Sequence, residues 1–284
     1  MKSILLVMTP FAGIYLDFKR NLEASGYDVR LVVDYRNKTR LIQEAAPADF
    51  ALVICPGDLT DDELACLRGK VGRLVAYQWM GLRKRPGVKD KRSFFDAFYV
   101  FDPEDVAEGF ELRENFWFDH LAEPPAVTHP PVDAYFLGSY DPRASSLIAL
   151  AGRINGLGLS LRMIMAGSFR GPRPNISGVS FPRVGVMYSD NLDHVRSAKV
   201  ILDVHNEDVH DGLSFRVFEA LGAGRKLVTT NKQVIYKDFY HPDNVHLLTD
   251  DDTSLADFFS RPMTQIDQTV RIRYGFKAWV SSIF

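Results

Sequence analysis

The stretch from Asp211 to Asn231 carries residues suited to bind a phosphorylated ligand. Gly212 allows a sharp turn, Ser214 can cap the helix that follows, and the free backbone N–H groups at that helix start suit a diphosphate. Arg216 in the first turn could add a bidentate phosphate contact. The carboxylate of Glu219, one turn further on, could accept hydrogen bonds from ribose hydroxyls. A capped amphipathic helix that simply packs through its apolar residues is the alternative interpretation.

A run of three polar residues, Thr229, Thr230 and Asn231, follows the apolar pair Leu227 and Val228. Open parallel sheets bind ligands beyond the carboxyl ends of their strands. We therefore expect this run to contribute to the same site.

The segment 205–211 holds two histidines and three acids in seven residues. Two imidazoles and a carboxylate can bind Zn²⁺ or Fe²⁺, but this spacing matches no standard metal site. We expect an acidic loop beside the ligand and no metal.

A basic loop occupies residues 83–92, with six cations and one acid in ten positions. Such a loop could rest on anionic lipid head groups or grip a phosphorylated glycolipid, and a solvated surface loop is the alternative. No aromatic platform or recognised module accompanies it, so nucleic-acid binding is not expected. The six cations are Arg83, Lys84, Arg85, Lys89, Lys91 and Arg92.

These candidates need parallel strands to position them, and the chain has that pattern. Short apolar runs rich in β-formers alternate with segments of helical period, which is typical of Rossmann-like α/β halves. Strands are predicted at 4–8, 29–33, 50–54, 74–77 and 98–101, and again at 134–137, 161–165, 200–204, 227–230 and 245–248. A capping box at Thr60–Glu63 predicts a helix start.

Four prolines in the nine residues 123–131 keep neither helical nor strand period. This predicts a Rossmann-like domain at 1–123, a linker at 124–131 and a second Rossmann-like domain at 132–268. The amphipathic segment 269–284 is expected to form a helix that docks back on the body.

The composition excludes several classes of protein. The chain has 284 residues, 34 Lys and Arg against 36 Asp and Glu, and two cysteines. It therefore has ample material for a core, no basic excess for coating nucleic acid and no disulfide framework. We expect a cytoplasmic protein that could lie peripherally on the inner face of the cytoplasmic membrane.

The segment from Leu213 to Asn231 resembles the Gly-Leu-(Ser/Thr)-Phe-Arg-Val-Phe-Glu-Ala-Leu … Thr-Thr-Asn signature of bacterial glycosyltransferases of lipopolysaccharide and capsular-polysaccharide biosynthesis. Segments 95–105, 137–140 and 200–205 agree with that family in the same order. The resemblance covers nearly the whole chain. It implies a GT-B-like fold, in which two Rossmann-like domains face a cleft and the second holds the nucleotide-sugar.

The resemblance also implies roles for individual residues. Arg216 and Asp211 would be catalytic, with Asp211 and Glu219 as a variant of the Glu-x7-Glu element of retaining enzymes. An inverting enzyme would need a base from the first domain, where Asp34, Asp58 and Asp102 all follow strands and the sequence does not choose. The donor contacts implied are Gly138, Ser139, Arg143, Gly212, Leu213, Ser214, Phe215, Glu219, Thr229, Thr230 and Asn231.

The expected function is therefore metal-independent transfer of a sugar from a UDP-, GDP- or CMP-linked donor to a surface glycan or glycolipid, without a cofactor. A non-catalytic nucleotide-sugar or glycan-binding protein is the alternative, suggested by Met80 where the family often has a polar residue and by the altered Asp211. A nucleotide-sugar epimerase is a third possibility.

Overall fold

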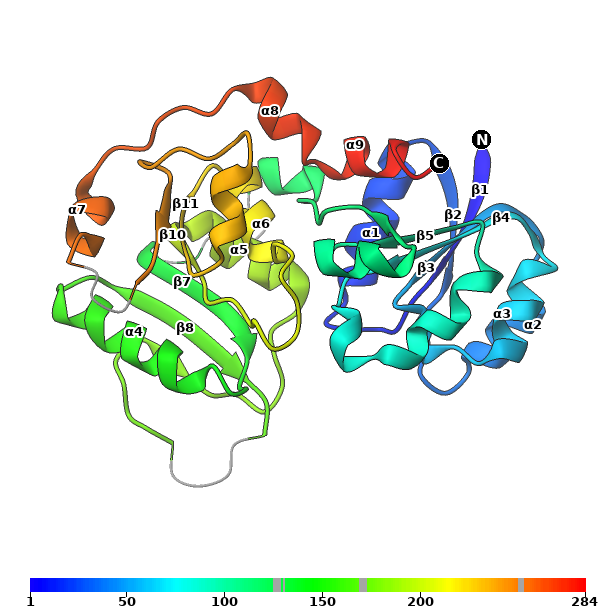
Figure 1. Ribbon diagram of the computed structural model, residues 1–284, viewed down its shortest axis with the longest axis horizontal. Coiled ribbons are helices and arrows are strands. Elements are labelled where there is room, and N and C mark those ends of the chain that lie inside the picture. The colour runs from blue at the N-terminus through cyan, green and yellow to red at the C-terminus, as the bar shows by residue number, and fades with distance from the viewer. Residues whose placement is uncertain (125–128, 130, 169–172, 250–252) are drawn as a thin grey trace. The chain divides into compact units, whose positions relative to one another are not determined.

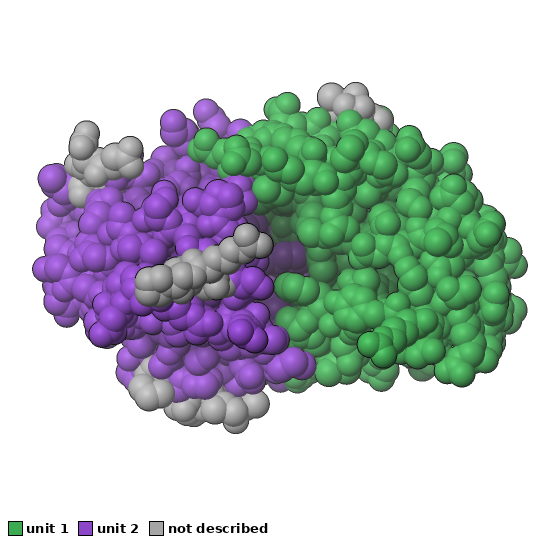
Figure 2. Space-filling model, turned by 90° about the horizontal axis from the view of Figure 1, so that it is seen from below, with its two compact units in different colours: residues 1–115, 207–213, 276–284 green, residues 116–206, 214–275 purple. Residues whose placement is uncertain are grey.

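A computed structural model describes the whole chain except residues 125–128, 130, 169–172 and 250–252. The chain divides into two compact units, coloured separately in Figure 2. Unit 1 comprises Met1–Asn115, Glu207–Leu213 and Phe276–Phe284, and unit 2 comprises Phe116–Asn206 and Ser214–Gly275. Most of the predicted linker at 124–131 lies outside the described residues, and the predicted domain ranges stay predictions.

Unit 1 is built on a six-stranded parallel sheet in the order β2-β1-β3-β4-β5-β6. Its strands are β1 (Lys2–Val7), β2 (Tyr27–Val32), β3 (Ala48–Ile54), β4 (Val71–Gln78), β5 (Ala97–Val100) and β6 (Glu111–Leu112). Its α-helices are α1 (Ile14–Ala24), α2 (Lys38–Glu44), α3 (Asp61–Arg68) and α9 (Phe276–Ser281). Its 3₁₀ helices are η1 (Pro56–Asp58), η2 (Leu82–Lys84), η3 (Pro86–Phe94) and η4 (Pro103–Glu108).

The local sequence explains these elements. Ile4 to Val7 in β1 are all buried, as expected of a strand covered on both faces of a parallel sheet. The predicted capping box is present at the start of α3, where the Thr60 hydroxyl accepts a hydrogen bond from the Glu63 amide at 3.2 Å. The Glu63 carboxylate in turn accepts one from the Thr60 amide at 2.8 Å.

Unit 2 is built on a second six-stranded parallel sheet, in the order β12-β11-β10-β7-β8-β9. Its strands are β7 (Val132–Ser139), β8 (Leu161–Ala166), β9 (Val179–Ser180), β10 (Ala198–Asp203), β11 (Lys226–Thr229) and β12 (Val245–Leu247). Its α-helices are α4 (Ala144–Gly156), α5 (Tyr188–Ser197), α6 (Phe215–Ala223), α7 (Leu255–Ser260) and α8 (Gln268–Arg273). Its 3₁₀ helices are η5 (Asp119–Ala122) and η6 (Lys232–Tyr236).

Numbered within unit 2 alone, these strands run 3-2-1-4-5-6, the order of dinucleotide-binding Rossmann sheets. Helix α4 covers one face of this sheet, as Figure 1 shows, and its Leu147 and Ile154 belong to the same buried cluster as Met163 of β8. Helix α6 ends at Gly224, whose φ of 62° is the left-handed conformation that glycine adopts at low cost. The prediction of two Rossmann-like α/β sheets is confirmed.

The prediction of one helix over 269–284 is wrong in detail, because that segment forms two short helices, α8 and α9. A hydrogen bond fixes the backbone of the segment that joins α8 to α9: the Trp117 amide donates to the Tyr274 carbonyl at 3.0 Å. A Cβ on Gly275 would lie 2.6 Å from a carboxylate oxygen of Asp119, so the backbone passes too close for a helix side chain there.

Helix α9 docks on unit 1, as predicted for the C-terminus, and lies beside α1 in Figure 1. Phe276 is fully buried with its ring 5.6 Å from that of Phe18. The ring of Trp279 lies 4.9 Å from Tyr77, edge to face. Among the described residues, none of the helices is long and apolar enough to cross a membrane.

Truncating Trp279 should therefore destabilise unit 1. We expect Trp279→Ala to lower the free energy of unfolding by about 3–5 kcal/mol, the usual cost of removing a buried aromatic side chain. Urea denaturation measures this, with Ile272→Ala in α8 as the control because that side chain is 55% exposed. Equal stability of the two variants would contradict the docking of α9.

Candidate functional site

The carboxyl edge of the unit 2 sheet has one point where the strand order reverses. From β7 the chain proceeds through α4 to β8 on one side, whereas β10 pairs with β7 on the other side. Such a switch point is where open α/β sheets bind ligands, because the loops on either side diverge there. The residues after β7 and β10 therefore form the candidate site.

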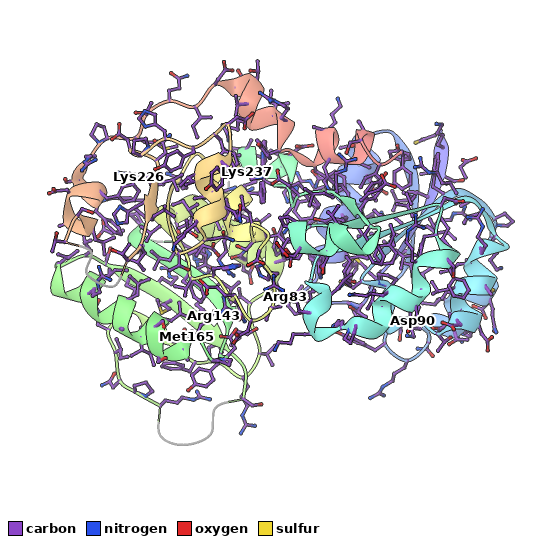
Figure 3. All side chains as sticks on the ribbon, viewed as in Figure 1. Arg83, Asp90, Arg143, Met165, Lys226 and Lys237 are labelled. Carbon is purple, nitrogen blue, oxygen red and sulfur yellow. The ribbon has the colours of Figure 1, made fainter. Side chains whose placement is uncertain are left out.

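Arg143 reaches across this switch point from the start of α4, where Figure 3 labels it. Its Nη1 donates to the Val204 carbonyl, just beyond β10, at 2.6 Å. Its Nε and Nη2 donate to the Asp141 carboxylate, with Nη2 at 2.6 Å. Burial tends to raise the pKa of Asp141, but Arg143 brings it below its ordinary value. The side chain of Arg143 is 15% exposed, so this guanidinium is held at the surface of the site.

Arg216 approaches the same point from the first turn of α6. Its Nη2 lies 2.9 Å and its Nε 3.0 Å from Oδ1 of Asp203, the last residue of β10. Its Nη1 donates to the Leu137 carbonyl in β7 at 3.2 Å, and its guanidinium stacks 5.1 Å from the ring centre of Phe136. Arg216 thus connects the two strands that flank the switch point.

Asp203 is fully buried and is the partner around which the site is organised. The Ser214 hydroxyl donates to its Oδ1 at 2.8 Å and the Thr229 hydroxyl to its Oδ2 at 2.9 Å. Burial alone would raise the pKa of Asp203, but Arg216 and the two hydroxyls hold it below the ordinary value. The carboxylate is therefore ionised at neutral pH.

The expectation that the Ser214 side chain caps α6 is wrong. Ser214 occupies the N-cap position, but its hydroxyl makes no capping hydrogen bond and instead donates to Asp203. An ionised carboxylate is a stronger acceptor than a backbone group, which explains the preference. The amides at the start of α6 thereby keep their N–H groups for other partners.

Glu219 is buried one turn beyond Arg216, with 3% of its surface exposed. Its Oε1 accepts hydrogen bonds from the Tyr188 hydroxyl at 2.6 Å and from the Asn191 side-chain amide at 3.1 Å. Burial raises the pKa of Glu219 above its ordinary value, and these contacts offset the rise only in part. The structure places Glu219 in a network between α5 and α6, and its contact with a ribose stays a prediction.

The polar run after β11 mostly ties the sheet edge together. Thr229 is buried against Asp203, and the Thr230 hydroxyl accepts a hydrogen bond from the His205 amide at 2.8 Å. Asn231 is 3% exposed and its Oδ1 accepts from the Gln233 amide at 2.9 Å. Thr230 is the member of this run that keeps a half-exposed side chain.

Gly138 and Ser139 end β7 on the same edge. A Cβ on Gly138 would lie 2.7 Å from the ring of Phe136, the ring on which Arg216 stacks. A side chain at position 138 would therefore clash with the Phe136 ring in its observed position. Ser139, the next residue, is exposed. Phe215 contributes packing, since its ring lies 5.3 Å from that of Phe116.

Asp211, Gly212 and Leu213 pack with unit 1 instead. The Asp211 carboxylate forms an ion pair with Arg83, and its amide donates to Asp102 at 3.1 Å. A Cβ on Gly212 would lie 2.5 Å from the Phe101 carbonyl oxygen, and Leu213 is buried with its carbonyl accepting from Asn115 at 2.9 Å. The roles predicted for these three residues toward the donor stay predictions.

Half of the basic loop is already paired with acids of unit 1. Arg83 pairs with Asp211, Arg85 with Asp58 at 3.1 Å and Lys91 with Asp61 at 3.3 Å. Arg92 donates to the Phe95 carbonyl, and Lys84 is exposed at the end of η2. The loop, which also contains Lys89, therefore presents a weaker positive field than its sequence implies.

The three acids weighed as a catalytic base differ in their surroundings. Asp102 is fully buried and accepts from the amides of Glu104 and Asp211. Asp58 pairs with Arg85, and Asp34 accepts from two loop amides whose hydrogen bonds lower its pKa. Burial removes Asp102 from direct contact with a substrate, and the geometry does not choose between the other two.

No cluster suited to a metal stands out in the part of the chain that the structure describes: no group of three or more His, Cys, Asp or Glu side chains could hold an ion there. His210 packs against Phe101, with ring centres 4.9 Å apart, and its Nδ1 lies 2.9 Å from the Gly212 carbonyl.

Sequence reasoning missed Asp203, Asp141, Tyr188 and Asn191. A signal for Asp203 was present, since an acid that ends the apolar run Val200–Leu202 of a buried strand needs a buried partner. Tyr188 and Asn191 left no comparable signal, because their partner Glu219 is distant in the chain.

No family model and no curated protein matches the chain. Solved glycosyltransferase structures are similar to it at low identity. SnogD from Streptomyces nogalater has 13% identity over 83% of this chain and 85% of that one, with a TM-score of 0.43. The glycotransferase of kitacinnamycin has 12% identity, 98% and 95% coverage and a TM-score of 0.47. MurG from Acinetobacter baumannii has 11% identity, 81% and 78% coverage and a TM-score of 0.41.

Substitutions that neutralise the two buried acids of the site, Asp203 and Glu219, should have opposite effects on stability. Asp203→Asn leaves Arg216 without its carboxylate partner and should lower the free energy of unfolding by about 3–5 kcal/mol at pH 7. Because the folded-state pKa of Asp203 lies below the unfolded value near 3.8, this difference from the wild type should be full above that pH and shrink as the pH falls through the lower folded pKa.

Glu219→Gln is the matched comparison. The folded-state pKa of Glu219 lies above the unfolded value near 4.5, so ionisation opposes folding at neutral pH. The Gln variant should be at least as stable as the wild type at pH 7 and lose any advantage below pH 4.5. Thermal unfolding from pH 3 to 8 measures both, and a large loss at pH 7 in Glu219→Gln would contradict this assignment.

Proposed function

We propose that the chain is a glycosyltransferase that moves a sugar from a nucleotide-sugar onto a glycan or glycolipid of lipopolysaccharide or capsule. One observation carries the proposal: Arg143 and Arg216 meet at the β7/β10 switch point, each fixed by an acid and by a strand-end carbonyl. The resemblance of Leu213–Asn231 to the family signature supports the choice of substrate class.

The two guanidiniums have donors left for a ligand. Each arginine has five N–H groups and uses three of its nitrogens in the contacts above, which leaves two N–H groups on each. Helices α4 and α6 also begin at this edge, so their positive N-terminal ends add to the field. A diphosphate is the ligand that this arrangement of charge fits.

In the proposed reaction the bond between the anomeric carbon of the sugar and the donor phosphate oxygen breaks, and the oxygen keeps the electron pair. The acceptor hydroxyl oxygen forms the new bond to the anomeric carbon and gives up its proton to a base. Negative charge thus grows on the departing nucleotide, where fixed N–H donors stabilise it without having to reorganise. We propose that Arg143 and Arg216 supply this stabilisation in place of a metal.

Arg143→Gln should weaken binding of UDP or GDP by about 10- to 100-fold, the effect of losing a charged hydrogen bond to phosphate. Isothermal titration with UDP, GDP and CMP tests this. Arg153→Gln is the control, because Arg153 lies in the same helix and its Nη1 donates to the Thr249 carbonyl at 3.1 Å. Unchanged affinity in Arg143→Gln would refute the proposed donor site.

Turnover separates the proposal from its alternatives. Release of nucleotide from a UDP-, GDP- or CMP-sugar that depends on an added glycolipid acceptor supports a transferase. Tight binding without turnover would indicate a nucleotide-sugar-binding protein, and isomerisation of the sugar without acceptor would indicate an epimerase.

We further propose that the basic loop contacts the anionic part of the acceptor or its membrane through Lys84 and Arg92, neither of which has a carboxylate partner in the described structure. Each such charge is worth about 1 kcal/mol near an anionic surface. The double variant Lys84→Gln/Arg92→Gln should therefore bind phosphatidylglycerol vesicles at least about fivefold more weakly in co-sedimentation. Lys199→Gln, a 69% exposed cation of unit 2, is the control and should match the wild type.

A further inference from the structure

A cavity of about 410 Å³ lies in unit 2 at the edge of the sheet away from the candidate donor site. Its lining residues Ser197 and Arg225 directly precede β10 and β11, so the cavity opens at the amino ends of these strands. Figure 3 labels Lys226, the first residue of β11, and Arg143 at opposite ends of this sheet. The volume falls in the range of small-molecule sites.

Three arginines line this cavity, and among the described residues one of them, Arg196, has a carboxylate partner. Arg196 pairs with Asp193 at 2.7 Å and also donates to the carbonyls of His120 and Leu121. Arg225 donates through Nη2 to the Arg196 carbonyl, and Arg271 through Nη2 to the Gly222 carbonyl. Within the described residues neither Arg225 nor Arg271 has an ion pair, and the Nη1 group of each makes no hydrogen bond.

Three buried nitrogen atoms of the cavity lining also have no hydrogen-bond partner in the described structure: Nε of Arg225, Nε of Arg271 and Nε2 of His129. Buried donors without acceptors are rare in proteins, so the Nε–H groups of Arg225 and Arg271 show that the described chain supplies too few acceptors for these two side chains. Glu123, the remaining acid of the lining, is exposed. The inner surface is therefore rich in donors and positively charged.

The packing of α8 fixes the position of the Arg271 guanidinium. The guanidinium of Arg271 stacks 5.4 Å from the ring centre of Trp117, and the indole N–H donates to the Arg271 carbonyl at 3.2 Å. A Cβ on Gly222 would lie 2.5 Å from the Trp117 ring, so glycine is needed at this wall. Both arginines are held partly buried, where a charge without a partner is costly.

We propose that this cavity binds the phosphate group of a small phosphorylated compound of about the size of a sugar phosphate. Two guanidiniums match a phosphate dianion, because each presents planar N–H donors to its oxygen atoms. Leu121, Ala122, Pro124 and Ala223 line the remainder and would face the organic part. The site is independent of the proposed sugar transfer and lies at the other edge of the sheet from Arg143.

Isothermal titration with glucose 6-phosphate and with inorganic phosphate, at constant ionic strength, tests the proposal. We expect Arg225→Gln and Arg271→Gln each to weaken binding of the phosphate group about tenfold or more. Ala223→Leu keeps both arginines, fills part of the cavity and should weaken glucose 6-phosphate more than inorganic phosphate. Arg273→Gln, an exposed arginine of the same helix as Arg271, should bind like the wild type.

The two probes also identify the source of the phosphate. Tighter binding of glucose 6-phosphate than of inorganic phosphate supports an organic phosphate, and equal binding supports the phosphate site while refuting an organic ligand. The proposal fails if neither probe binds at ~10 mM, or if Arg225→Gln and Arg271→Gln bind both as the wild type does. It also fails if Arg143→Gln alone abolishes binding, because the anion then occupies the donor site.

Discussion

The buried ion pair between Asp203 and Arg216 is the interaction on which the candidate site depends. Moving a carboxylate out of water is costly, and here four donated contacts offset that cost: two from Arg216 and one each from Ser214 and Thr229. These contacts join β10, β11 and the start of α6, and the Leu137 carbonyl adds β7. The position of the Arg216 guanidinium is thereby fixed by contacts within unit 2.

The arginines at the two edges of the unit 2 sheet differ in their partners. At the carboxyl edge Arg143 and Arg216 each form an ion pair with an acid, Asp141 and Asp203 respectively. At the amino edge Arg225 and Arg271 donate to backbone carbonyls, Arg271 also stacks on Trp117, and neither has an ion pair among the described residues. Arginine is thus paired with carboxylates at one edge of the sheet and with backbone carbonyls at the other.

The signature segment is divided where the sequence shows no break. Residues 207–213 pack with unit 1, because Gly212 lets the backbone lie against Phe101 and because Arg83 and Asn115 hold the segment. From Ser214 onward the chain packs with unit 2. Asp211 and Arg216, both predicted from the sequence to be catalytic, therefore belong to different compact units and have different neighbours.

The sequence by itself determined the parallel strands, the capping box of α3 and the α/β class, because each follows from residue periodicity or from a contact within a few positions. It also marked Arg216 as a candidate from its place in the first turn of a helix, whereas Arg143 came from the family resemblance, and the roles of both stay predictions. Only the tertiary structure decided the contacts of several other residues. The Ser214 hydroxyl donates to Asp203 rather than capping the helix, and Glu219 is buried. Half of the basic loop is paired with acids, and the helix expected over 269–284 is interrupted at Gly275. These outcomes depend on groups that are distant in the chain and become neighbours only when the sheets form.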